Sequence, residues 1–412
     1  MKTKLFFSIF SFLTVLSTFS QETTVNLSLG AGYTNQVYYK LSTQTQTDFV
    51  ANSWDIAFLR TSSYSQAIVV NDAIGIEVFE ASSNITEWDT IDVANETNWT
   101  QLYNSYIERS NGAFNQGSAS YGWGEYNVTT HLVTGSVIFV LKYADASYKK
   151  FICEQYAAGY TIKYSSWDGT TWGENKTAVI ANSNNPDNNY NYYSLQNEEE
   201  VVAEPAATDW DFVFRKYTTD YPYGETTIKY TVTGVLLSDN VEVAKATGDD
   251  TPNLTYATDI NTIGYDWKTY TGSYVTNPDA KYYVKDKNGT IYKLYFTEFA
   301  GSSTGDVEFK FEDVTSTLNI EEVGESVAFG VYPNPVNSSK KINIIFDVNK
   351  VNQNENSVEI YNLSGQRVLK TNVTNTQGFY NKEIDLSALN SGVYMLKFIS
   401  GDYQEFKKIV MQ

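Results

Sequence analysis

The sequence has few of the side chains that usually bind metals or form cross-links. Its 412 residues include one histidine, one cysteine and three methionines. A single histidine, His131, excludes the H-E-x-x-H zinc motif and the common histidine-rich metal clusters. A single cysteine, Cys153, excludes an intramolecular disulfide, so the hydrophobic core must stabilise the fold by itself. The phosphate-binding pattern G-x-x-x-x-G-K is also absent. We therefore expect no metal site, no catalytic residues and no enzymatic activity.

The first 20 residues have the three parts of a secretory signal peptide. Lys2 and Lys4 form a positively charged start, and residues 5–16 form an apolar stretch that is too short to span a membrane. Thr18 and Ser20 are small residues at the positions that a signal peptidase recognises, so we expect cleavage after Ser20. No later segment is apolar enough to cross a membrane. We therefore expect an exported chain without a transmembrane segment.

Negative charge is concentrated in residues 21–330, the body of the chain. This body carries 18 Lys+Arg against 41 Asp+Glu, whereas residues 331–412 carry 9 against 7. A net charge of −23 on the body repels the phosphates of nucleic acids and anionic lipids. We therefore expect no nucleic-acid partner.

The composition predicts an all-β protein. Aromatic residues make up 15% of the chain, with 33 tyrosines and 8 tryptophans, and aromatic residues fit the half-buried surface of a pleated sheet. One short helix is expected at residues 97–109, because five apolar side chains there follow the i, i+3, i+4, i+7 spacing of a helix. These five are Trp99, Leu102, Tyr103, Tyr106 and Ile107.

The body contains an internal duplication. A Trp-Asp pair followed three residues later by Phe occurs at Trp54-Asp55 and again at Trp210-Asp211, and a Tyr-Tyr segment precedes each copy. A similar hairpin follows each copy, at residues 135–156 and 279–299. The repeated order of these parts predicts two related β-rich halves, residues 22–185 and 190–316. We expect residues 54–60 and 210–216 to occupy equivalent strands.

The two hairpins differ in their predicted turns. Asn288-Gly289 is typical of a two-residue type I′ turn, because both residue types accept a positive φ. The first copy has Asp145-Ala146 at this place and is one residue shorter. Its turn is expected to be less regular.

The last 84 residues carry several specific motifs, which include Tyr332-Pro333-Asn334-Pro335 and the closing Lys407-Lys408-Ile409-Val410. This pattern resembles the C-terminal sorting domain of the type IX secretion system of Bacteroidetes. The resemblance implies a small β-sandwich over residues 329–412, joined to the body by a polar linker, residues 317–328. It also implies recognition by the type IX secretion machinery and, after passage through the periplasm, a location on the outer-membrane surface or in the medium.

The body resembles the HmuY family of Bacteroidetes haem-binding proteins, which are all-β. Short motifs carry this resemblance: Trp54 to Phe58, Gly122-Trp123 with Tyr126 and His131, and their counterparts Trp210 to Phe214 and Asp266-Trp267 with Tyr270. The resemblance implies haem, or a haem-carrying protein, as the partner. Binders of this family hold the iron with two histidines or methionines, whereas this body has one histidine and no methionine. Aligning the hairpins sets His131 opposite Tyr274, and both residue types ligate haem iron. These two are the candidate cofactor-binding residues.

Two alternatives stand beside haem binding. His131 can be an ordinary half-exposed strand residue, replaceable by tyrosine because both side chains are amphipathic. The abundant tyrosines and tryptophans can also form an exposed aromatic surface of an adhesion module that binds glycans or proteins. A contiguous exposed row of these side chains would favour the second alternative. Burial of the side chains in the sheets would remove the reason for proposing it.

Overall fold

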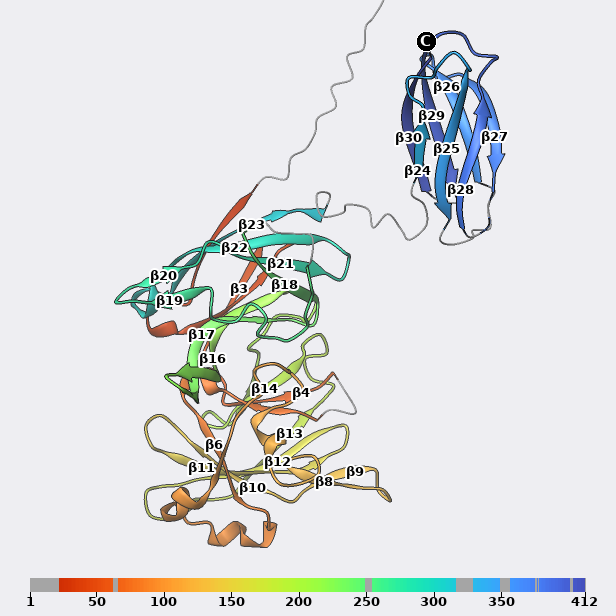
Figure 1. Ribbon diagram of the computed structural model, residues 1–412. Helices are drawn as coiled ribbons and strands as arrows, with labels where there is room; N and C mark the ends of the chain where they lie inside the picture. Colours follow the sequence, from red (N-terminus) through yellow and green to blue (C-terminus); the bar gives the residue numbers. More distant parts are fainter. Residues whose placement is uncertain are drawn as a thin grey trace, which may run out of the picture. The chain divides into compact units, whose positions relative to one another are not determined.

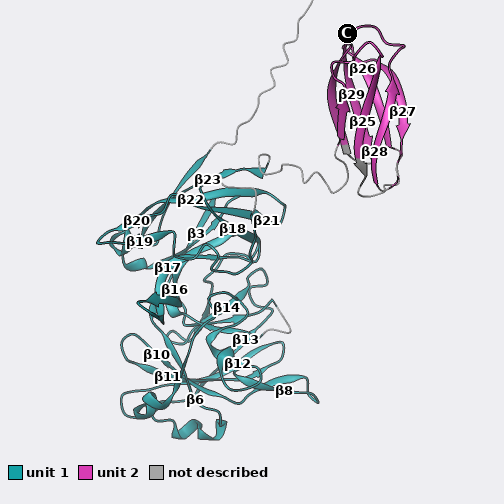
Figure 2. Ribbon diagram, in the orientation of Figure 1, with its two compact units in different colours: residues 1–315 teal, residues 316–412 magenta. Residues whose placement is uncertain are grey.

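The computed structural model describes residues 22–61, 66–248, 254–315, 329–348, 356–374, 376, 378–400 and 403–411. The chain divides into two compact units, Met1–Thr315 and Ser316–Gln412 (Figure 2). Antiparallel sheets build both units (Figure 1), which confirms the all-β prediction. None of the helices among these residues is long and apolar enough to cross a membrane. The predicted signal peptide with its Ser20 cleavage site, and the predicted linker 317–328, lie outside the described residues.

The first unit contains two lobes, each with two sheets around a core. The larger sheet of lobe 1 has the order β13 (Lys176–Ala181), β12 (Gly159–Ser166), β11 (Tyr148–Tyr156), β10 (Ile138–Lys142), β6 (Glu77–Ser82) and β7 (Thr100–Leu102). A hairpin of β8 (Gly124–Asn127) and β9 (Leu132–Gly135) joins it through β11. The smaller sheet has the order β15 (Glu199–Val201), β14 (Tyr190–Ser194), β4 (Ile56–Leu59) and β5 (Ile68–Val70).

Lobe 2 repeats this arrangement. Its larger sheet has the order β1 (Thr23–Ser28), β23 (Asp306–Asp313), β22 (Ile291–Phe299), β21 (Ala280–Asp286) and β18 (Val241–Thr247). Its smaller sheet has the order β17 (Thr226–Leu237), β16 (Phe212–Tyr223), β2 (Asn35–Lys40) and β3 (Thr45–Val50), and β19 (Lys268–Tyr270) pairs with β20 (Tyr274–Thr276). Short 3-10 turns connect the strands: η1 (Ala31–Tyr33), η2 (Asp72–Ile74), η3 (Ile85–Thr90), η4 (Val93–Asn98), η5 (Ala113–Gln116) and η6 (Gly301–Ser303).

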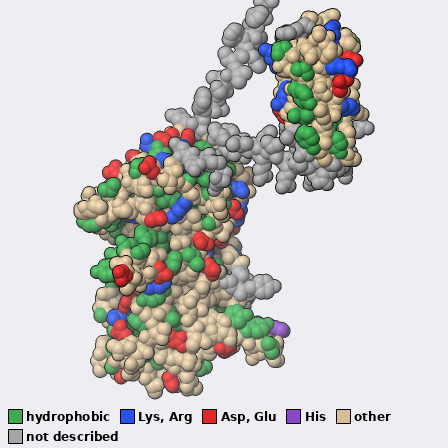
Figure 3. All heavy atoms as spheres, in the orientation of Figure 1, with side chains coloured by type: hydrophobic (Ala, Val, Ile, Leu, Met, Phe, Trp, Pro, Cys, Tyr) green, Lys and Arg blue, Asp and Glu red, His purple; other side chains and the backbone are tan. Residues whose placement is uncertain are grey.

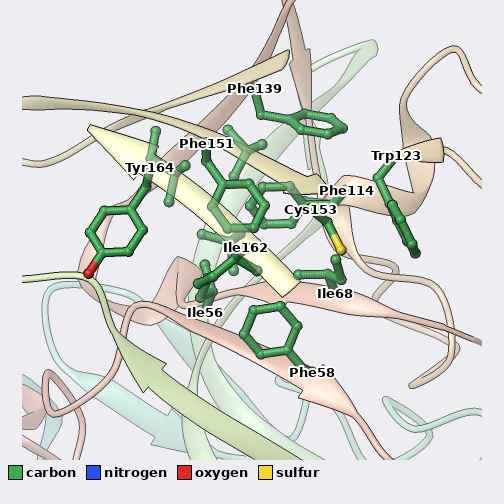
Figure 4. Close-up of a cluster of buried hydrophobic side chains, with 14 of the residues drawn as sticks. Ile56, Phe58, Ile68, Phe114, Trp123, Phe139, Phe151, Cys153, Ile162 and Tyr164 are labelled. Carbon is green, nitrogen blue, oxygen red and sulfur yellow. The ribbon is translucent and has the colours of Figure 1, made fainter. Parts of the chain in front are cut away.

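Large aromatic side chains fill the space between the two sheets of each lobe. In lobe 1, Phe58 from β4 faces Phe151 and Cys153 from β11 (Figure 4), and all three are fully buried. Burial raises the pKa of the Cys153 thiol well above its ordinary value, so this cysteine behaves as a small hydrophobic side chain. Burying one such aromatic ring stabilises the fold by roughly 2–3 kcal/mol. The packed core thus provides the stability that disulfides provide in many exported proteins.

The duplication is present in the structure, with an exchange of strands. β4, which follows Trp54, pairs with β14, which carries the second Tyr-Tyr segment. β16, which follows Trp210, pairs with β2, which carries the first Tyr-Tyr segment. Matching the strands of the two lobes gives a first repeat from β1 to β12 and a second from β13 to β23. Each lobe therefore takes three strands from one repeat and the remainder from the other.

This exchange corrects the predicted division at residues 185–190. Strands β1 to β3 were expected in the first half, but they pair with β23 and β16 and complete lobe 2. Strands β14 and β15 were expected in the second half, but they pair with β4 and complete lobe 1. The chain therefore begins in lobe 2, builds all of lobe 1, and returns to lobe 2 at β16.

The aspartate of each Trp-Asp pair fastens the exchanged strand. The Asp55 amide donates to Tyr193 O at 3.0 Å, and the Asp211 amide donates to Tyr39 O at 2.8 Å. The Asp211 carboxylate accepts from the Leu41 amide at 2.7 Å and from Lys40 Nζ at 2.8 Å. The Asp55 carboxylate accepts from the Gln196 amide at 3.0 Å. Both aspartates are buried, so these bonds offset the cost of desolvating a carboxylate.

The predicted helix at 97–109 is not formed. η4 ends at Asn98, and β7 follows at once, with Leu102 paired to Val78 of β6. Beyond β7, Asn104 Oδ1 accepts from the Val70 amide at 3.1 Å and its Nδ2 donates to Val70 O at 2.8 Å. Sheet pairing thus takes residues 100–102 into β7, and the Asn104 side chain serves the backbone of Val70 in β5, so tertiary packing overrides the helical spacing.

Both hairpin turns also differ from prediction, because they share one three-residue loop. In the second copy, the Asp286 amide donates to Thr290 O and the Gly289 amide to Asp286 O, with Gly289 at φ 84°. In the first copy, Tyr143 and Ser147 make the equivalent bond, and Ala146 has φ 61°. The loop is therefore equally regular in both copies, and an alanine holds the left-handed position in the first.

The second unit is a β-sandwich. One sheet has the order β24 (Phe329–Tyr332), β25 (Lys341–Val348) and β28 (Gly378–Asp385), and the other has the order β27 (Arg367–Val373), β26 (Asn356–Asn362), β29 (Gly392–Ser400) and β30 (Tyr403–Met411). Phe346 and Phe398 meet in the core, with ring centroids 5.3 Å apart. In the Tyr332-Pro333-Asn334-Pro335 motif, Asn334 Nδ2 donates to Lys408 O at 2.7 Å and its Oδ1 accepts from the Val410 amide at 3.0 Å. The motif is thereby fastened to the last strand.

Candidate functional site

His131 lies in the turn of the β8–β9 hairpin and is exposed, where the sequence suggested a strand residue. Its amide donates to Asn127 O at 2.8 Å, and its φ is 58°. Its Nδ1 is hydrogen-bonded to the hydroxyl of Tyr126 at 2.8 Å. Figure 3 shows the histidine at the outer edge of the molecule. The ring is thus oriented by one neighbour and otherwise faces solvent.

Tyr274 lies on the equivalent hairpin of lobe 2, at the start of β20. Its ring contacts Tyr270 and Phe299, with centroids 5.1 and 4.7 Å away. Figure 1 places the two hairpins on opposite sides of the first unit. The structure therefore does not bring His131 and Tyr274 together, and they cannot ligate the same haem within one chain. In the described part of the chain, no three His, Cys, Asp or Glu side chains gather as metal ligands.

The tryptophans of the repeats do not form an exposed row. Trp54, Trp123, Trp210 and Trp267 are at most 1% exposed. They pack in the cores or between the lobes, and Trp123 and Trp267 each donate through Nε1 to a backbone carbonyl at 3.1 Å. Among the described residues of the first unit, the aromatic side chains that are strongly exposed are tyrosines, such as Tyr223, Tyr230 and Tyr270.

Several tyrosines gather at the far end of the β16–β17 hairpin, which sequence reasoning did not single out. β2 pairs only with Phe212–Phe214 of β16, so the hairpin continues past the sheet as a two-stranded ribbon. Gly224 closes it with φ 60° at the first turn position. The alternation of β16 and β17 then sets several tyrosines near the turn. We name this group the tyrosine patch: Tyr221, Tyr223 and Tyr230, which share one face of the ribbon, with Tyr265 against Tyr221.

The rings of the tyrosine patch lie against one another. Tyr221 lies between Tyr230 and Tyr265, with ring centroids 5.1 and 5.6 Å away. Tyr223 and Tyr230 are 68% and 53% exposed. Figure 3 shows hydrophobic and acidic side chains side by side in the region where Figure 1 has this hairpin. The patch therefore offers large ring surfaces to solvent.

One ion pair, on the face of the ribbon opposite the tyrosine patch, holds the ribbon against lobe 1. Asp220 accepts from Lys229 Nζ at 2.7 Å and from the Tyr106 hydroxyl at 2.9 Å, and Lys229 Nζ lies 5.2 Å from the centre of the Tyr106 ring. The hydrogen bonds from Lys229 and Tyr106 lower the pKa of Asp220. The same bond to Asp220 raises the pKa of the Tyr106 phenol. The ribbon thus has an ion pair on the face turned toward Tyr106 and exposed phenol rings on the other face.

Comparison with known families bears on the second unit. Residues 330–412 match the family model of the secretion system C-terminal sorting domain. This part of the chain is a type IX secretion sorting domain. No curated protein matches the chain. Among solved structures, apo PinO from Porphyromonas gingivitis matches with 10% identity over 71% of this chain and 96% of its own, at a TM-score of 0.23.

The sorting domain determines where the first unit acts. It directs export through the type IX secretion system to the cell surface or the medium. The tyrosine patch and the His131 hairpin are therefore exported with the first unit.

Proposed function

We propose that the protein is a non-enzymatic binding protein, exported by the type IX system, whose first unit binds glycan chains at the tyrosine patch. The observation that carries this proposal is the ring contact of Tyr221 with Tyr230, together with the exposed ring of Tyr223, on one face of the β16–β17 ribbon. Flat phenol rings offer contact area at a low entropy cost. The phenol hydroxyls at the edges of these rings can pair with sugar hydroxyls.

The shape of the patch fits an extended ligand. It lies along a ribbon that projects beyond its sheet, and its rings face outward. A sugar ring presents one apolar face of C–H groups, which stacks on a phenol ring, while its hydroxyls reach polar groups at the edge. An exposed surface of this kind can contact several sugar units in a row. An enclosed pocket would instead select a single small molecule.

The chain offers little support for catalysis in its first unit. Residues 301–305, Gly-Ser-Ser-Thr-Gly, match the spacing of a serine nucleophile motif. They connect the antiparallel strands β22 and β23, however, and the Ser303 hydroxyl donates to Ala300 O at 2.9 Å. A hydrolase motif would instead lead from a strand into a helix. This local structure favours a binding role.

A glycan array tests the proposal with the purified full chain. We expect Tyr223→Ala and Tyr230→Ala each to weaken binding of the positive glycans by about tenfold, which corresponds to about 1.4 kcal/mol. Tyr270→Ala is the matched control, because Tyr270 is equally exposed but lies on the β19–β20 hairpin. An array without positive glycans, or equal losses in all three variants, would reject the tyrosine patch as a glycan site.

Haem binding at His131 is the second candidate. Nδ1 is hydrogen-bonded to the Tyr126 hydroxyl, and Nε2 is directed away from it. In the tautomer in which Nδ1–H donates to Tyr126, Nε2 has a free lone pair, and such a partner on the far nitrogen is what orients a ligating imidazole. Haemin titration of the full chain, read by the Soret band, tests this idea beside His131→Ala and Tyr274→Phe. No Soret shift at micromolar haemin would end it. A shift that survives both substitutions would place haem elsewhere.

A further inference from the structure

A cavity of about 80 Å³ lies between the two lobes of the first unit. Both lobes contribute to its walls. Trp54, Arg109 and Tyr190 come from lobe 1, and Trp210, Arg215 and Tyr38 from lobe 2. The cavity adjoins the β16–β17 ribbon at Tyr106, on the face opposite the tyrosine patch, and the proposal for it does not depend on glycan binding.

An arginine from the opposite lobe lies over the ring of each tryptophan in this cavity. The guanidinium of Arg215 lies 5.4 Å from the centre of the Trp54 ring, and that of Arg109 lies 5.0 Å from the Trp210 ring. The duplication relates the two tryptophans, but it does not relate the two arginines. Arg215 is the fourth residue after Asp211, and Leu59 holds that place after Asp55. Two independent positions thus direct a cation to the same cavity.

Both arginines have weak counter-charges. Arg215 Nη2 lies 3.4 Å from Asp72 Oδ1, and Arg109 Nε lies 3.4 Å from Asp239 Oδ1. Charge-assisted bonds of this type normally measure about 2.7–2.9 Å. Asp239 is also exposed, so water screens its charge. Each guanidinium also donates to one backbone carbonyl, Arg109 to Leu237 O and Arg215 to Lys216 O, and a guanidinium has five N–H groups, so both retain capacity for a further acceptor.

The two indole N–H groups at the cavity are unsatisfied. Nε1 of Trp54 and Nε1 of Trp210 are buried and have no hydrogen-bond partner among the described residues. A buried donor without an acceptor costs about 1–3 kcal/mol, so native proteins rarely leave one. The other repeat-related pair, Trp123 and Trp267, has an acceptor in each lobe. Among these four tryptophans the deficit is thus confined to the pair that lines the cavity, and the hydroxyl of Tyr217, which also lines it, is likewise buried without a partner among the described residues.

We propose that this cavity binds a short-chain carboxylate, such as acetate or propionate. Guanidinium and indole groups are donors only, so the missing ligand must accept hydrogen bonds, and the two cations favour an anion. The cavity volume is about half that of a protein cavity that holds benzene. The ligand is therefore limited to a few heavy atoms. The rings of Tyr38 and Tyr190 receive its short apolar tail.

Titration of the full chain with sodium propionate tests the site, with propionamide as the uncharged control of equal shape and sodium chloride as the control for anions in general. The readout is the set of tryptophan indole N–H signals in a nitrogen-labelled sample, which Trp54→Phe and Trp210→Phe assign by deletion. We expect propionate to shift these two signals and to leave those of Trp123 and Trp267 in place. Propionamide and chloride should shift neither.

A substitution then ties the shift to the cavity. Arg215→Gln should weaken propionate binding at least tenfold, whereas Arg60→Gln should leave it unchanged, because Arg60 donates to the carbonyls of Asn182 and Asn188 and is not part of the cavity wall. If Arg215→Gln fails to fold, Arg109→Gln serves in its place. No shift with propionate, or an equal shift with chloride, would overturn the proposal.

Discussion

The indole of Trp54 packs edge-on against the phenol of Tyr192, with ring centroids 4.9 Å apart and planes at 77°. Trp210 and Tyr38 repeat this contact at 5.0 Å and 82°. In both pairs the tryptophan comes from one repeat and the tyrosine from the other. The stability of each lobe is therefore a joint property of both repeats, and changes at the exchanged strands should be more costly than changes at the surface.

Removing the carboxylate that fastens β2 should destabilise the first unit. Asp211→Ala leaves the Leu41 amide without its acceptor and Lys40 without its counter-charge in a mostly buried place. We expect a loss of about 3 kcal/mol in the free energy of unfolding, measured by urea denaturation. Asp266→Ala is the control, since its ion pair with Lys245 is exposed and should cost less than about 1 kcal/mol. Similar losses in both variants would contradict the fastening role.

The two equivalent hairpin loops give a matched test of backbone strain. Ala146 has φ 61°, a region that costs an alanine roughly 1 kcal/mol relative to glycine. Ala146→Gly should therefore stabilise the first unit by about 0.5–1 kcal/mol. Gly289→Ala should destabilise it by a similar amount, because Gly289 has φ 84° and open space where a Cβ would stand. Thermal melts of both variants check this, and effects of the same sign would refute it.

The buried carboxyl of Glu204 should make stability depend on pH. Burial is the main cause that raises its pKa to about 7, against the opposing Arg109 charge and hydrogen bonds from the Tyr190 amide and the Tyr192 hydroxyl. Between pH 4.5 and 7 the unfolded chain is ionised at this residue while the folded chain keeps its proton. The stability that Glu204 contributes is thus greatest below pH 4.5 and is lost as the pH rises to about 7.

Glu204→Gln isolates this effect from other titrating groups. Relative to the parent, the variant should gain stability as the pH rises from 4.5 to 7, by an amount that approaches about 3 kcal/mol, and show no further change above pH 8. Urea denaturation at pH 4.5, 6 and 8 measures the difference. A difference that does not vary with pH would mean that Glu204 has an ordinary pKa.

Deleting residues 329–412 should retain the protein in the periplasm, because the sorting domain is the part that the secretion machinery recognises. Cell fractionation with an antibody to the first unit measures this. Mass spectrometry of the exported parent protein should show an N-terminus near Gln21 and loss of the sorting domain. Unchanged amounts of the deletion variant on the surface or in the medium would contradict the prediction.

The sequence located the repeated parts but could not tell which copies pair. The segments around Tyr38-Tyr39 and Tyr192-Tyr193 have the same hydrophobic pattern, so either could pair with the strand after Trp54. The choice depends on how the chain crosses between lobes after Val50 and after Val201, which local patterns do not encode. The helix prediction failed for a related reason, because Asn104 satisfies the backbone of a distant strand.

The candidate sites, too, could be predicted from the sequence only in part. The sequence drew attention to His131 because it is unique, whereas the tyrosine patch is formed from common residues. Tyr221, Tyr223 and Tyr230 stand at alternating strand positions on the two sides of the turn residue Gly224. This pattern in the sequence could have indicated the patch. That these rings project past the sheet follows only from the shortness of β2. The walls of the cavity come from both lobes, so no single segment of the sequence could have predicted it.

The pairing of β1 with β23 sets the order in which the chain can acquire its structure. Every strand of lobe 1 lies between Ile56 and Val201, so this lobe can close as soon as those residues have emerged. Thr24, by contrast, pairs with Lys310. The earliest strands of the body must therefore wait, with unpaired edges, until almost the whole body has left the translocation pore. Contacts between such distant residues form slowly, so the long-lived vulnerable species during export is a chain with one finished lobe and one open one.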